Sequence, residues 1–341
     1  MIKMTGAGAT AIVAEALEKT YRRGRTPVPA LRGLDFEVPR GSVFGMLGPN
    51  GAGKSTTTKI LTTLSRPDAG RASVAGHDVT TDAAAVRRAV GYVSQGTGAD
   101  PLLTGAENLA LAGRLRGLSR IAARERATAL LHEFGLTDAG SRAVGSYSGG
   151  MRRRLDVACA LVHRPEVLFL DEPTTGLDPE ARAAMWAEIR RLSAEGGLTV
   201  VLTTHYLEEA DRLADELVII DHGTKVVQGT AAELKSALRG DTVRVALFEP
   251  DPAAVRLAVA GIPALREVVV EVNGPVGSLV ARTDDASAAV GRVIAALEGS
   301  GIPFGAVAAS RPSLDDVYLH HVGRSIDTAA RGAAHQEGAA A

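Results

Sequence analysis

The sequence predicts an α/β domain followed by a small α+β domain of the ferredoxin-like type. From Ile12 to Leu238, short apolar runs of strand length alternate with helical segments, which is the pattern of an α/β domain. After Arg239-Gly240 the expected order becomes strand, helix, strand, strand, helix, strand. Hydrophobic residues make up 45% of the 341 residues, so a sizeable core is available and wholesale disorder is excluded.

The first domain, residues 12–238, contains five expected strands and a helical insert. The strands are Ser42–Leu47, Val90–Ser94, Val167–Leu170, Thr199–Thr203 and Leu217–Ile220. The turn residues 221–224 (Asp-His-Gly-Thr) then lead into Lys225-Val226-Val227, which predicts a hairpin. Between the second and third strands, residues 101–161 are rich in helical patterns, with helices expected over Ala106–Leu115 and Ile121–Phe134.

The second domain, residues 241–322, is expected to have four strands and two helices. The strands are Asp241–Phe248, Val268–Val272, Ser278–Arg282 and Ile302–Ala309, and the helices are Asp251–Ala260 and Ala286–Glu298. No catalytic set converges in this domain, so its residues alone assign it no chemistry. Residues 1–11 and 324–341 are rich in small residues and are expected to be flexible.

Charge and cysteine content exclude several classes of protein. Lys and Arg number 38 and Asp and Glu number 39, a net charge of -1 that argues against a nucleic-acid scaffold. The single cysteine, Cys159, excludes an internal disulfide and a multi-cysteine zinc site, and a buried thiol in a reducing compartment is the simplest interpretation. The start of the chain lacks a signal-peptide pattern, and no run approaches the roughly 20 apolar residues that cross a bilayer.

A phosphate-binding loop is the most specific motif. The residues Gly48, Pro49, Asn50, Gly51, Ala52, Gly53, Lys54 and Ser55 match G-x-x-x-x-G-K-[ST], which this composition produces by chance roughly 0.01 times. The glycines let backbone N–H groups approach phosphate oxygens, and a helix-competent segment follows. Lys54 can neutralise the β- and γ-phosphates, and the Ser55 hydroxyl can bind Mg²⁺. The alternative is a glycine-rich turn without a ligand.

Two carboxylates follow an apolar strand of the same domain. Asp171 and Glu172 come directly after residues 167–170, and ligands of α/β domains bind at the carboxyl ends of strands. We expect Asp171 to hold the metal ion, and Glu172 to orient or deprotonate the attacking water. His205 ends the run 199–204 and could contact the γ-phosphate, although a lone histidine is more often structural.

A second anion site is suggested by Ser148, Gly149 and Gly150, which precede a helical pattern over residues 151–158. The serine and the free amides at a helix start can bind an anion. For the tripeptide alone, an ordinary helix cap is the simpler interpretation. The arginines at 152–154 would then form a solvated face.

Together these motifs resemble the nucleotide-binding subunit of an ATP-binding cassette (ABC) transporter, over about Ile12 to Leu238 and in the order of that family. The resemblance implies an ABC-type P-loop NTPase fold with a mixed sheet and a helical subdomain, and it implies ATP and Mg²⁺ as ligands. The resemblance implies that Tyr21 stacks on adenine and that the Walker A residues 48–55, with Thr56, bind phosphate. It implies that Gln95 binds Mg²⁺ and links to a membrane partner, and that His205 senses the γ-phosphate. The remaining family motifs are the signature at residues 147–151, the end of Walker B at Asp171 and Glu172, and the D-loop at Asp178.

The signature departs from Leu-Ser-Gly-Gly-Gln at both ends, with Tyr147 and Met151. This version, followed by Arg-Arg-Arg-Leu-Asp, resembles the daunorubicin/doxorubicin-resistance class of ABC-2 exporters. The segment 312–319 (Pro-Ser-Leu-Asp-Asp-Val-Tyr-Leu) resembles the same class. The resemblance implies a peripheral protein on the cytoplasmic face of the cell membrane that energises export of a hydrophobic, anthracycline-like compound. The residues themselves define neither the substrate nor the direction of transport.

The resemblance also implies partners. One chain has one P-loop and one signature, and in this family each ATP site joins the P-loop of one copy to the signature of another. We therefore expect a head-to-tail homodimer with two ATP molecules, in which Ser148, Gly149 and Gly150 act across the interface. A separate ABC-2 membrane permease is expected to dock near Gln95 and residues 98–108, and no nucleic-acid partner is expected.

Two other functions compete with transport. A soluble ABC ATPase acting on ribosomes normally has two cassettes in one chain, and one acting on DNA needs long coiled-coil insertions that the spacing from Gln95 to Ser148 cannot hold. A non-hydrolysing regulatory module would be expected if Glu172 were absent. The sequence favours the transporter subunit.

Overall fold

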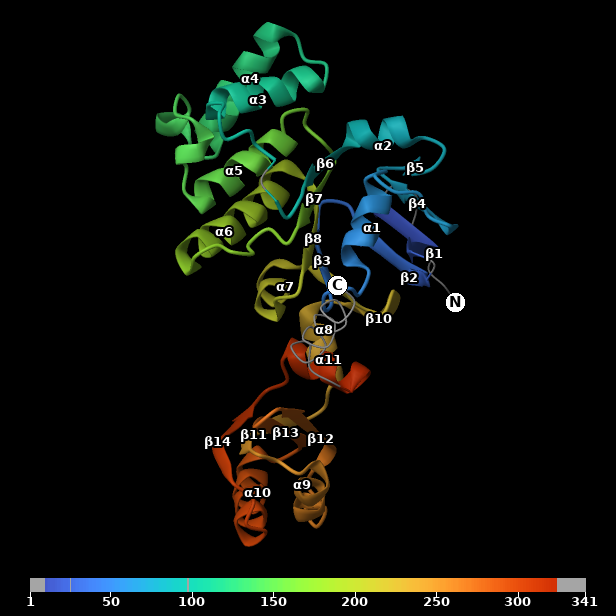
Figure 1. Cartoon of the computed structure of the whole chain (residues 1–341), viewed down its shortest axis with the longest axis vertical. Coiled ribbons are helices and arrows are strands. Elements are labelled where there is room, and N and C mark those ends of the chain that lie inside the picture. Colours follow the sequence, from blue (N-terminus) through green and yellow to red (C-terminus); the bar gives the residue numbers. More distant parts are fainter. Residues whose placement is uncertain (1–9, 25, 97, 324–341) are drawn as a thin grey trace. The chain divides into compact units, whose positions relative to one another are not determined.

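The computed structural model describes residues 10–24, 26–96 and 98–323, and the chain divides into two units after Gln228 (Figure 1). This division comes before the boundary expected at Leu238, because helix α8 (Ala231–Ala237) contacts α11 (Leu314–Val322) of the second unit. The expected flexible segment 1–11 ends sooner than predicted, since Thr10 and Ala11 already belong to a strand and Ala11 is buried. The expected flexible tail, 324–341, lies outside the described residues.

A six-stranded sheet forms the centre of the first unit, in the order β10-β9-β3-β8-β7-β6. Its strands are β3 (Val43–Leu47), β6 (Val90–Val93), β7 (Val167–Asp171), β8 (Thr199–Thr204), β9 (Glu216–Asp221) and β10 (Thr224–Gly229). The strands from β9 to β6 pair in parallel, and β3, β7 and β8 are buried along their whole length. Continuous apolar runs are what a sheet covered on both faces requires, so these strands match the sequence prediction.

Helices surround this sheet and extend beyond it as a helical subdomain (Figure 1). They are α1 (Lys54–Leu61), α2 (Ala83–Ala89), α3 (Gly105–Leu115), α4 (Arg120–Glu133), α5 (Gly149–Ala160), α6 (Pro179–Gly196) and α7 (Leu207–Leu213), with short 3₁₀ turns at Thr137–Ala139 and Val144–Ser146. The start of α3 is fixed by a capping box, in which Thr104 and Glu107 satisfy each other's backbone N–H groups. Leu109, Leu130 and Leu155 join α3, α4 and α5 in one core.

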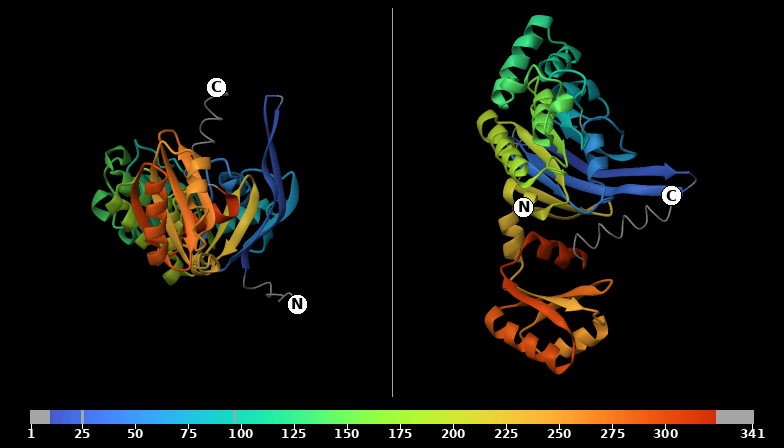
Figure 2. Two further views of the ribbon diagram at one scale, coloured as in Figure 1. Left: turned by 90° about the horizontal axis from the view of Figure 1, so that it is seen from below. Right: turned by 60° about the vertical axis from the view of Figure 1, so that its left-hand side comes forward.

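A second sheet of the first unit has the order β2-β1-β4-β5. Its strands are β1 (Thr10–Arg23), β2 (Thr26–Pro39), β4 (Ala69–Val74) and β5 (His77–Asp78). The sequence prediction did not name them. The long β1–β2 hairpin, which projects in the right view of Figure 2, contains several register shifts, and Ala16 has a φ of 47°. These bulges break the two-residue alternation that identifies a strand.

The second unit has the βαββαβ order expected from the sequence. Its elements are β11 (Asp241–Phe248), α9 (Pro252–Val259), β12 (Arg266–Asn273), β13 (Val276–Thr283), α10 (Ala286–Gly299) and β14 (Phe304–Ser310). The strands form an antiparallel sheet in the order β12-β13-β11-β14, and Val243, Val255 and Val293 belong to its core. This is the ferredoxin-like arrangement. Helix α11, capped by Ser313 and Asp316, was not predicted.

None of the helices in the described part of the chain combines the length and apolar character needed to span a bilayer.

Candidate functional site

The loop between β3 and α1 depends on glycines for its shape. A Cβ on Gly48 would lie 2.2 Å from the carbonyl oxygen of Ile220, and Gly53, which precedes α1, has a φ of 110°. The loop is also supported from β9–β10, because the N–H of Gly223 donates to the carbonyl of Ala52 at 2.9 Å. The glycines and this hydrogen bond therefore hold the phosphate loop in place at the carboxyl end of β3.

Lys54 begins α1 and is buried inside this loop, with 5% of its surface exposed. Its ammonium group donates to the carbonyl oxygens of Gly48, at 2.6 Å, and Pro49, at 3.0 Å. Burial lowers the pKa of Lys54 to about 8, although the nearby carboxylates of Glu172 and Asp171 act in the opposite direction. Among the described residues, both hydrogen-bond acceptors of this buried cation are carbonyl groups, which leaves its charge suited to bind phosphate oxygens.

Asp171 ends β7, where the parallel register places it opposite Thr203 of β8. Its Oδ1 accepts hydrogen bonds from the hydroxyl of Thr203, at 2.5 Å, and from that of Ser55, at 3.4 Å. Neighbouring ligands of an octahedral Mg²⁺, each bound at its usual distance, are separated by about 3 Å. Ser55 and Asp171 thus fit a magnesium ion in donor type and in separation.

Glu172 is held in a strained conformation, with a φ of 47°. Its N–H donates to the hydroxyl of Thr203 at 3.1 Å. Its carboxylate accepts from Gln95 Nε2 at 2.8 Å and from the hydroxyl of Thr175 at 3.3 Å, and it lies 3.2 Å from His205 Nδ1. The hydrogen bond with His205 is the main reason that the pKa of Glu172 is below its usual value. The fold thus brings together Gln95, Glu172 and His205, which lie far apart in the sequence.

The signature residues begin α5. The Ser148 hydroxyl accepts from the N–H of Met151 at 3.2 Å, and Gly149 and Gly150 form the first turn. Asp178 caps α6 in the same way, and Ser148, Gly150 and Asp178 line one hollow of about 260 Å³. Within one chain, Ser148 is therefore a helix cap, and it lines an open hollow together with Gly150.

Arg153 contradicts the expected solvated face of α5. It is 7% exposed, and its guanidinium donates to the carbonyl oxygens of Ser94, at 2.6 Å, Pro173, at 2.9 Å, and Asp171, at 3.0 Å. Burial lowers the pKa of this arginine. The sequence carries no signal for this burial, because the acceptors are backbone groups of distant segments.

The structure adds two further residues to the site. Thr203 contacts both Asp171 and Glu172, and it could have been inferred from the pairing of the strand that ends at Asp171 with the strand that ends just before His205. Asp156 of α5 accepts from the N–H groups of residues 98 and 99, which follow Gln95, and burial raises its pKa.

Tyr21 and Thr56 complete the predicted set. Tyr21 lies on β1 opposite Val28, is 40% exposed, and has the ammonium of Lys19 at 5.7 Å from its ring centroid. Thr56 follows Ser55 in the first turn of α1 and is partly buried. Adenine stacking by Tyr21 and phosphate binding by Thr56 stay predictions.

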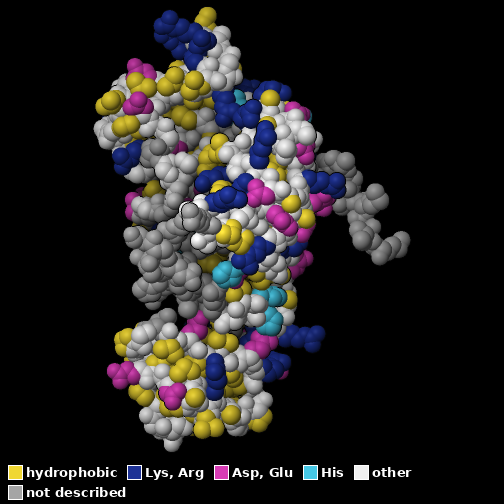
Figure 3. All heavy atoms as spheres, turned by 45° about the vertical axis from the view of Figure 1, so that its right-hand side comes forward, with side chains coloured by type: hydrophobic (Ala, Val, Ile, Leu, Met, Phe, Trp, Pro, Cys, Tyr) yellow, Lys and Arg dark blue, Asp and Glu magenta, His cyan; other side chains and the backbone are white. Residues whose placement is uncertain are grey.

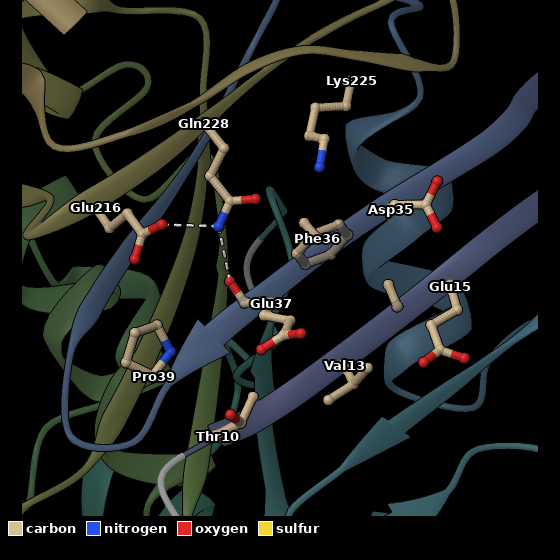
Figure 4. A pocket seen from close by; sticks show the side chains of 11 residues that line it. Thr10, Val13, Glu15, Asp35, Phe36, Glu37, Pro39, Glu216, Lys225 and Gln228 are labelled. Carbon is tan, nitrogen blue, oxygen red and sulfur yellow. Dashed lines mark hydrogen bonds between the residues drawn. The ribbon is translucent and has the colours of Figure 1, made fainter. Parts of the chain in front are cut away.

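A larger hollow of about 560 Å³ lies between β1–β2 and β9–β10 (Figure 4). Its carboxylates are Glu15, Asp35, Glu37 and Glu216. Gln228 donates to Glu216 at 2.8 Å, and Lys225 is the basic residue of the lining. Four carboxylates repel a triphosphate, so this hollow does not suit ATP.

Comparison with known proteins agrees with the motifs. A family model described as ABC transporter matches residues 31–175. The chain is 49% identical to a daunorubicin resistance ATP-binding protein of Streptomyces coeruleorubidus, over 92% of this chain and 96% of that protein. It is 41% identical to a Nod factor export ATP-binding protein of Ralstonia nicotianae, over 94% of this chain and 97% of that protein.

Among solved structures, the chain is similar to a dimeric ATP-binding cassette in a post-hydrolysis state bound to ADP and Pi. The TM-score is 0.59 at 26% identity, and the match covers 64% of this chain and 98% of the other. The cassette fold predicted from the sequence is confirmed by this similarity.

Proposed function

This chain belongs to the ABC transporter family as an ATP-hydrolysing, ATP-binding subunit of an exporter, and we propose that two copies enclose ATP and drive a separate membrane permease. The observation that carries this proposal is the cluster around Glu172. Its carboxylate is held by Gln95 and lies beside His205. Lys54 is close enough to Glu172 and Asp171 for their charges to raise its pKa, and its own charge lowers the pKa of Glu172. The proposed base (Glu172), cation (Lys54) and metal ligand (Asp171) therefore lie together at the carboxyl end of the sheet.

The roles follow from the chemistry of these groups. Lys54 exchanges its carbonyl partners for the β- and γ-phosphates of ATP, where a cation offsets the developing charge. Ser55 and Asp171, with Gln95, would hold Mg²⁺, which neutralises phosphate charge when bound. Glu172 orients and deprotonates the attacking water, and its contacts with Gln95 and His205 fix the direction of the carboxylate.

The dimer is supported by a counting argument. Each chain has one P-loop and one signature, and a similar cassette has been solved as a dimer with ADP and Pi. We place Ser148, Gly149 and Gly150 against the γ-phosphate held by the partner copy, and Asp178 shares one hollow with Ser148 and Gly150. ATP joins the copies, and hydrolysis releases them.

The transported compound is proposed from the relatives. Several are named for daunorubicin or doxorubicin resistance, and their similarity extends over the second unit as well. We therefore propose export of an apolar, anthracycline-like compound, with the chain bound peripherally at the cytoplasmic face of the membrane. A hollow of about 290 Å³ next to the Gln95 loop includes Leu111 and Leu115, which are 47% and 78% exposed, and this surface suits an apolar segment of the permease.

A nucleic-acid partner is less well supported. On the face shown in Figure 3, Lys and Arg side chains are interspersed with Asp and Glu, without a continuous basic stripe. The formal charge of -1 agrees with this distribution.

Glu172→Gln tests the proposed site. The variant should bind ATP normally and lose 100-fold or more in kcat, on the order of what a general base contributes. Light scattering in Mg²⁺-ATP should then show a stable dimer. Glu166→Gln, at an exposed glutamate paired with Arg40, is the matched control and should behave as the wild type. Near-normal turnover of Glu172→Gln, or a monomer in ATP, would contradict the proposal.

Transport needs a separate test. The neighbouring reading frame of the genome should encode a six-helix permease, and the pair should lower cellular sensitivity to anthracyclines. Neither the permease alone nor the pair carrying Glu172→Gln should protect. Protection by the permease alone would remove this chain from the transport reaction.

A further inference from the structure

Arg153 makes three charge-assisted hydrogen bonds from one guanidinium group. Its acceptors are the carbonyl oxygens of Ser94, Asp171 and Pro173, at 2.6, 3.0 and 2.9 Å. The side chain is 7% exposed, so these bonds compete little with water. The planar fork of five N–H groups thus joins two backbone segments, 171–173 and Ser94, in a fixed geometry that the compact ammonium of a lysine does not reproduce.

The three acceptors share one property, which is their relation to Glu172. Asp171 and Pro173 are the residues directly before and after it, and Ser94 directly precedes Gln95, which donates to the Glu172 carboxylate. Glu172 has a φ of 47°, and such a conformation persists only where the surroundings fix it. Arg153 therefore holds the backbone on both sides of a strained residue and the segment that carries its amide partner.

The position of Arg153 connects this cluster to the signature. Ser148 caps the same helix, α5, and Arg153 lies in its second turn. One turn further, Asp156 accepts from the N–H groups of Gly98 and Ala99 at 3.1 Å each. Helix α5 thus holds the Gln95 loop from both sides, through Ser94 and through residues 98 and 99.

We propose that Arg153 is a positioning residue that couples the two ATP sites of the dimer, by linking the signature of a chain to Glu172 of the same chain. This inference rests on the proposed head-to-tail dimer. Ser148–Gly150 engage ATP of the partner copy, and that engagement fixes α5. Arg153 then holds Glu172 in its reactive orientation, so ATP bound at one site increases hydrolysis at the other.

The alternative is an arginine that only stabilises the fold, and the chain offers a matched example. Arg126 of α4 is partly buried, and it donates to the carbonyl of Leu161 at 3.1 Å, at the far end of α5. It touches neither the Gln95 loop nor the β7 end through that bond. Arg126→Lys therefore reports what loss of an arginine tether on α5 does to stability alone.

The experiment uses the full chain with Mg²⁺-ATP and compares the wild type with Arg153→Lys and Arg126→Lys. For each protein, the thermal midpoint, the Kd of a fluorescent ATP analogue, kcat and the Hill coefficient for ATP are measured. We expect Arg153→Lys to keep Kd within about threefold, to lose 10-fold or more in kcat, and to lower the Hill coefficient to 1 from a wild-type value above 1. Arg126→Lys should lower the thermal midpoint and leave kcat and cooperativity unchanged.

The double variant Arg153→Lys/Glu172→Gln should still dimerise in ATP, which shows that the interface itself is intact. If the lysine variant fails to fold, Arg153→Gln decides by the same criteria, since it keeps two N–H donors without a buried charge. Unchanged kcat, or a reduced kcat with unchanged cooperativity, overturns the coupling role. A wild type that neither dimerises nor hydrolyses ATP instead overturns the proposed function, and this inference with it.

Discussion

At the scale of single residues, Thr203 shows how one hydroxyl organises two acids with different tasks. It donates to the carboxylate of Asp171 at 2.5 Å and accepts from the N–H of Glu172 at 3.1 Å. The same Oδ1 lies 3.4 Å from the Ser55 hydroxyl, so the first bond fixes the Asp171 carboxylate beside Ser55, and the second fixes the backbone of Glu172. A hydroxyl can do this because it carries one donor and two acceptor lone pairs.

Thr203→Val should therefore impair hydrolysis, because the β-branched shape is kept while both hydrogen bonds are lost. We expect kcat to fall about 10- to 100-fold, in line with the loss of positioning of a base and a metal ligand. Thr203→Ser keeps the hydroxyl and should retain most of the activity. Steady-state ATPase assays of both variants provide the measurement, and equal losses in the two would show that the methyl group matters rather than the hydroxyl.

Cys159 offers a second prediction at this scale. Cys159 is partly rather than fully buried, which corrects the buried thiol expected from the sequence, and it lines the hollow next to the Gln95 loop. Desolvation on α5 still raises the pKa of its thiol to about 12, so almost none of it is thiolate at pH 8. Relative to an exposed thiol, alkylation by iodoacetamide in the native protein should be about 1,000-fold slower. Mass spectrometry follows the reaction at this single cysteine, and the same chain in guanidinium chloride gives the reference rate. Native labelling within tenfold of that reference would show that the thiol is accessible.

At the scale of elements, the phosphate loop owes its shape to a turn that lies far away in sequence. His222 and Gly223 join β9 to β10 with positive φ values of 47° and 79°, as a type I′ turn requires. Gly223 donates to the carbonyl of Ala52, and its own carbonyl accepts from the N–H of Arg32 at 2.9 Å. The turn therefore binds the loop on one side and β2 on the other.

Gly223→Ala should destabilise the first unit more than a comparable glycine substitution elsewhere. The new Cβ would lie 2.6 Å from the carbonyl oxygen of Ala30, so the backbone must shift. Gly76→Ala is the control, because Gly76 has a similar φ of 83° but open space around it. We expect a loss of about 1 kcal/mol for the control and about 2 kcal/mol more for Gly223→Ala, measured by urea unfolding. Equal losses would mean that the loop does not depend on this turn.

The strands and the helix faces also show which parts of the fold and of the site the sequence could predict. The central strands were found because burial on both faces makes them continuous apolar runs, and the P-loop because its glycines follow from phosphate geometry. The strands β1 and β2 were not named because bulges interrupt their alternation. Arg153 was assigned to a solvated face because its partners are carbonyl groups, which carry no sequence signal.

At the scale of the whole molecule, the P-loop and the signature that bind one ATP can belong to the same chain (cis) or to two chains (trans). Lys54 and Ser148 each begin a helix of the first unit, and each presents amides or charge suited to phosphate. If one ATP bound both groups of a single chain, the two would act in cis. The proposed dimer instead assigns them to different copies at each site, so that the two models predict opposite results for mixed dimers.

Lys54→Ala and Ser148→Arg therefore form the decisive pair. Each variant alone should lose hydrolysis, the first through loss of phosphate binding and the second because a large cation fills the start of α5. In a mixed head-to-tail dimer, both substitutions fall in one site and the other site is intact. Equal mixing should thus restore activity, with a ceiling of about a quarter of the wild type by random assortment and a lower value if coupling through Arg153 slows the one intact site, whereas cis action would restore none. ATPase assays of the two variants, alone and after mixing in ATP-free buffer, distinguish the models, and a mixture no more active than its components would exclude sites shared between copies.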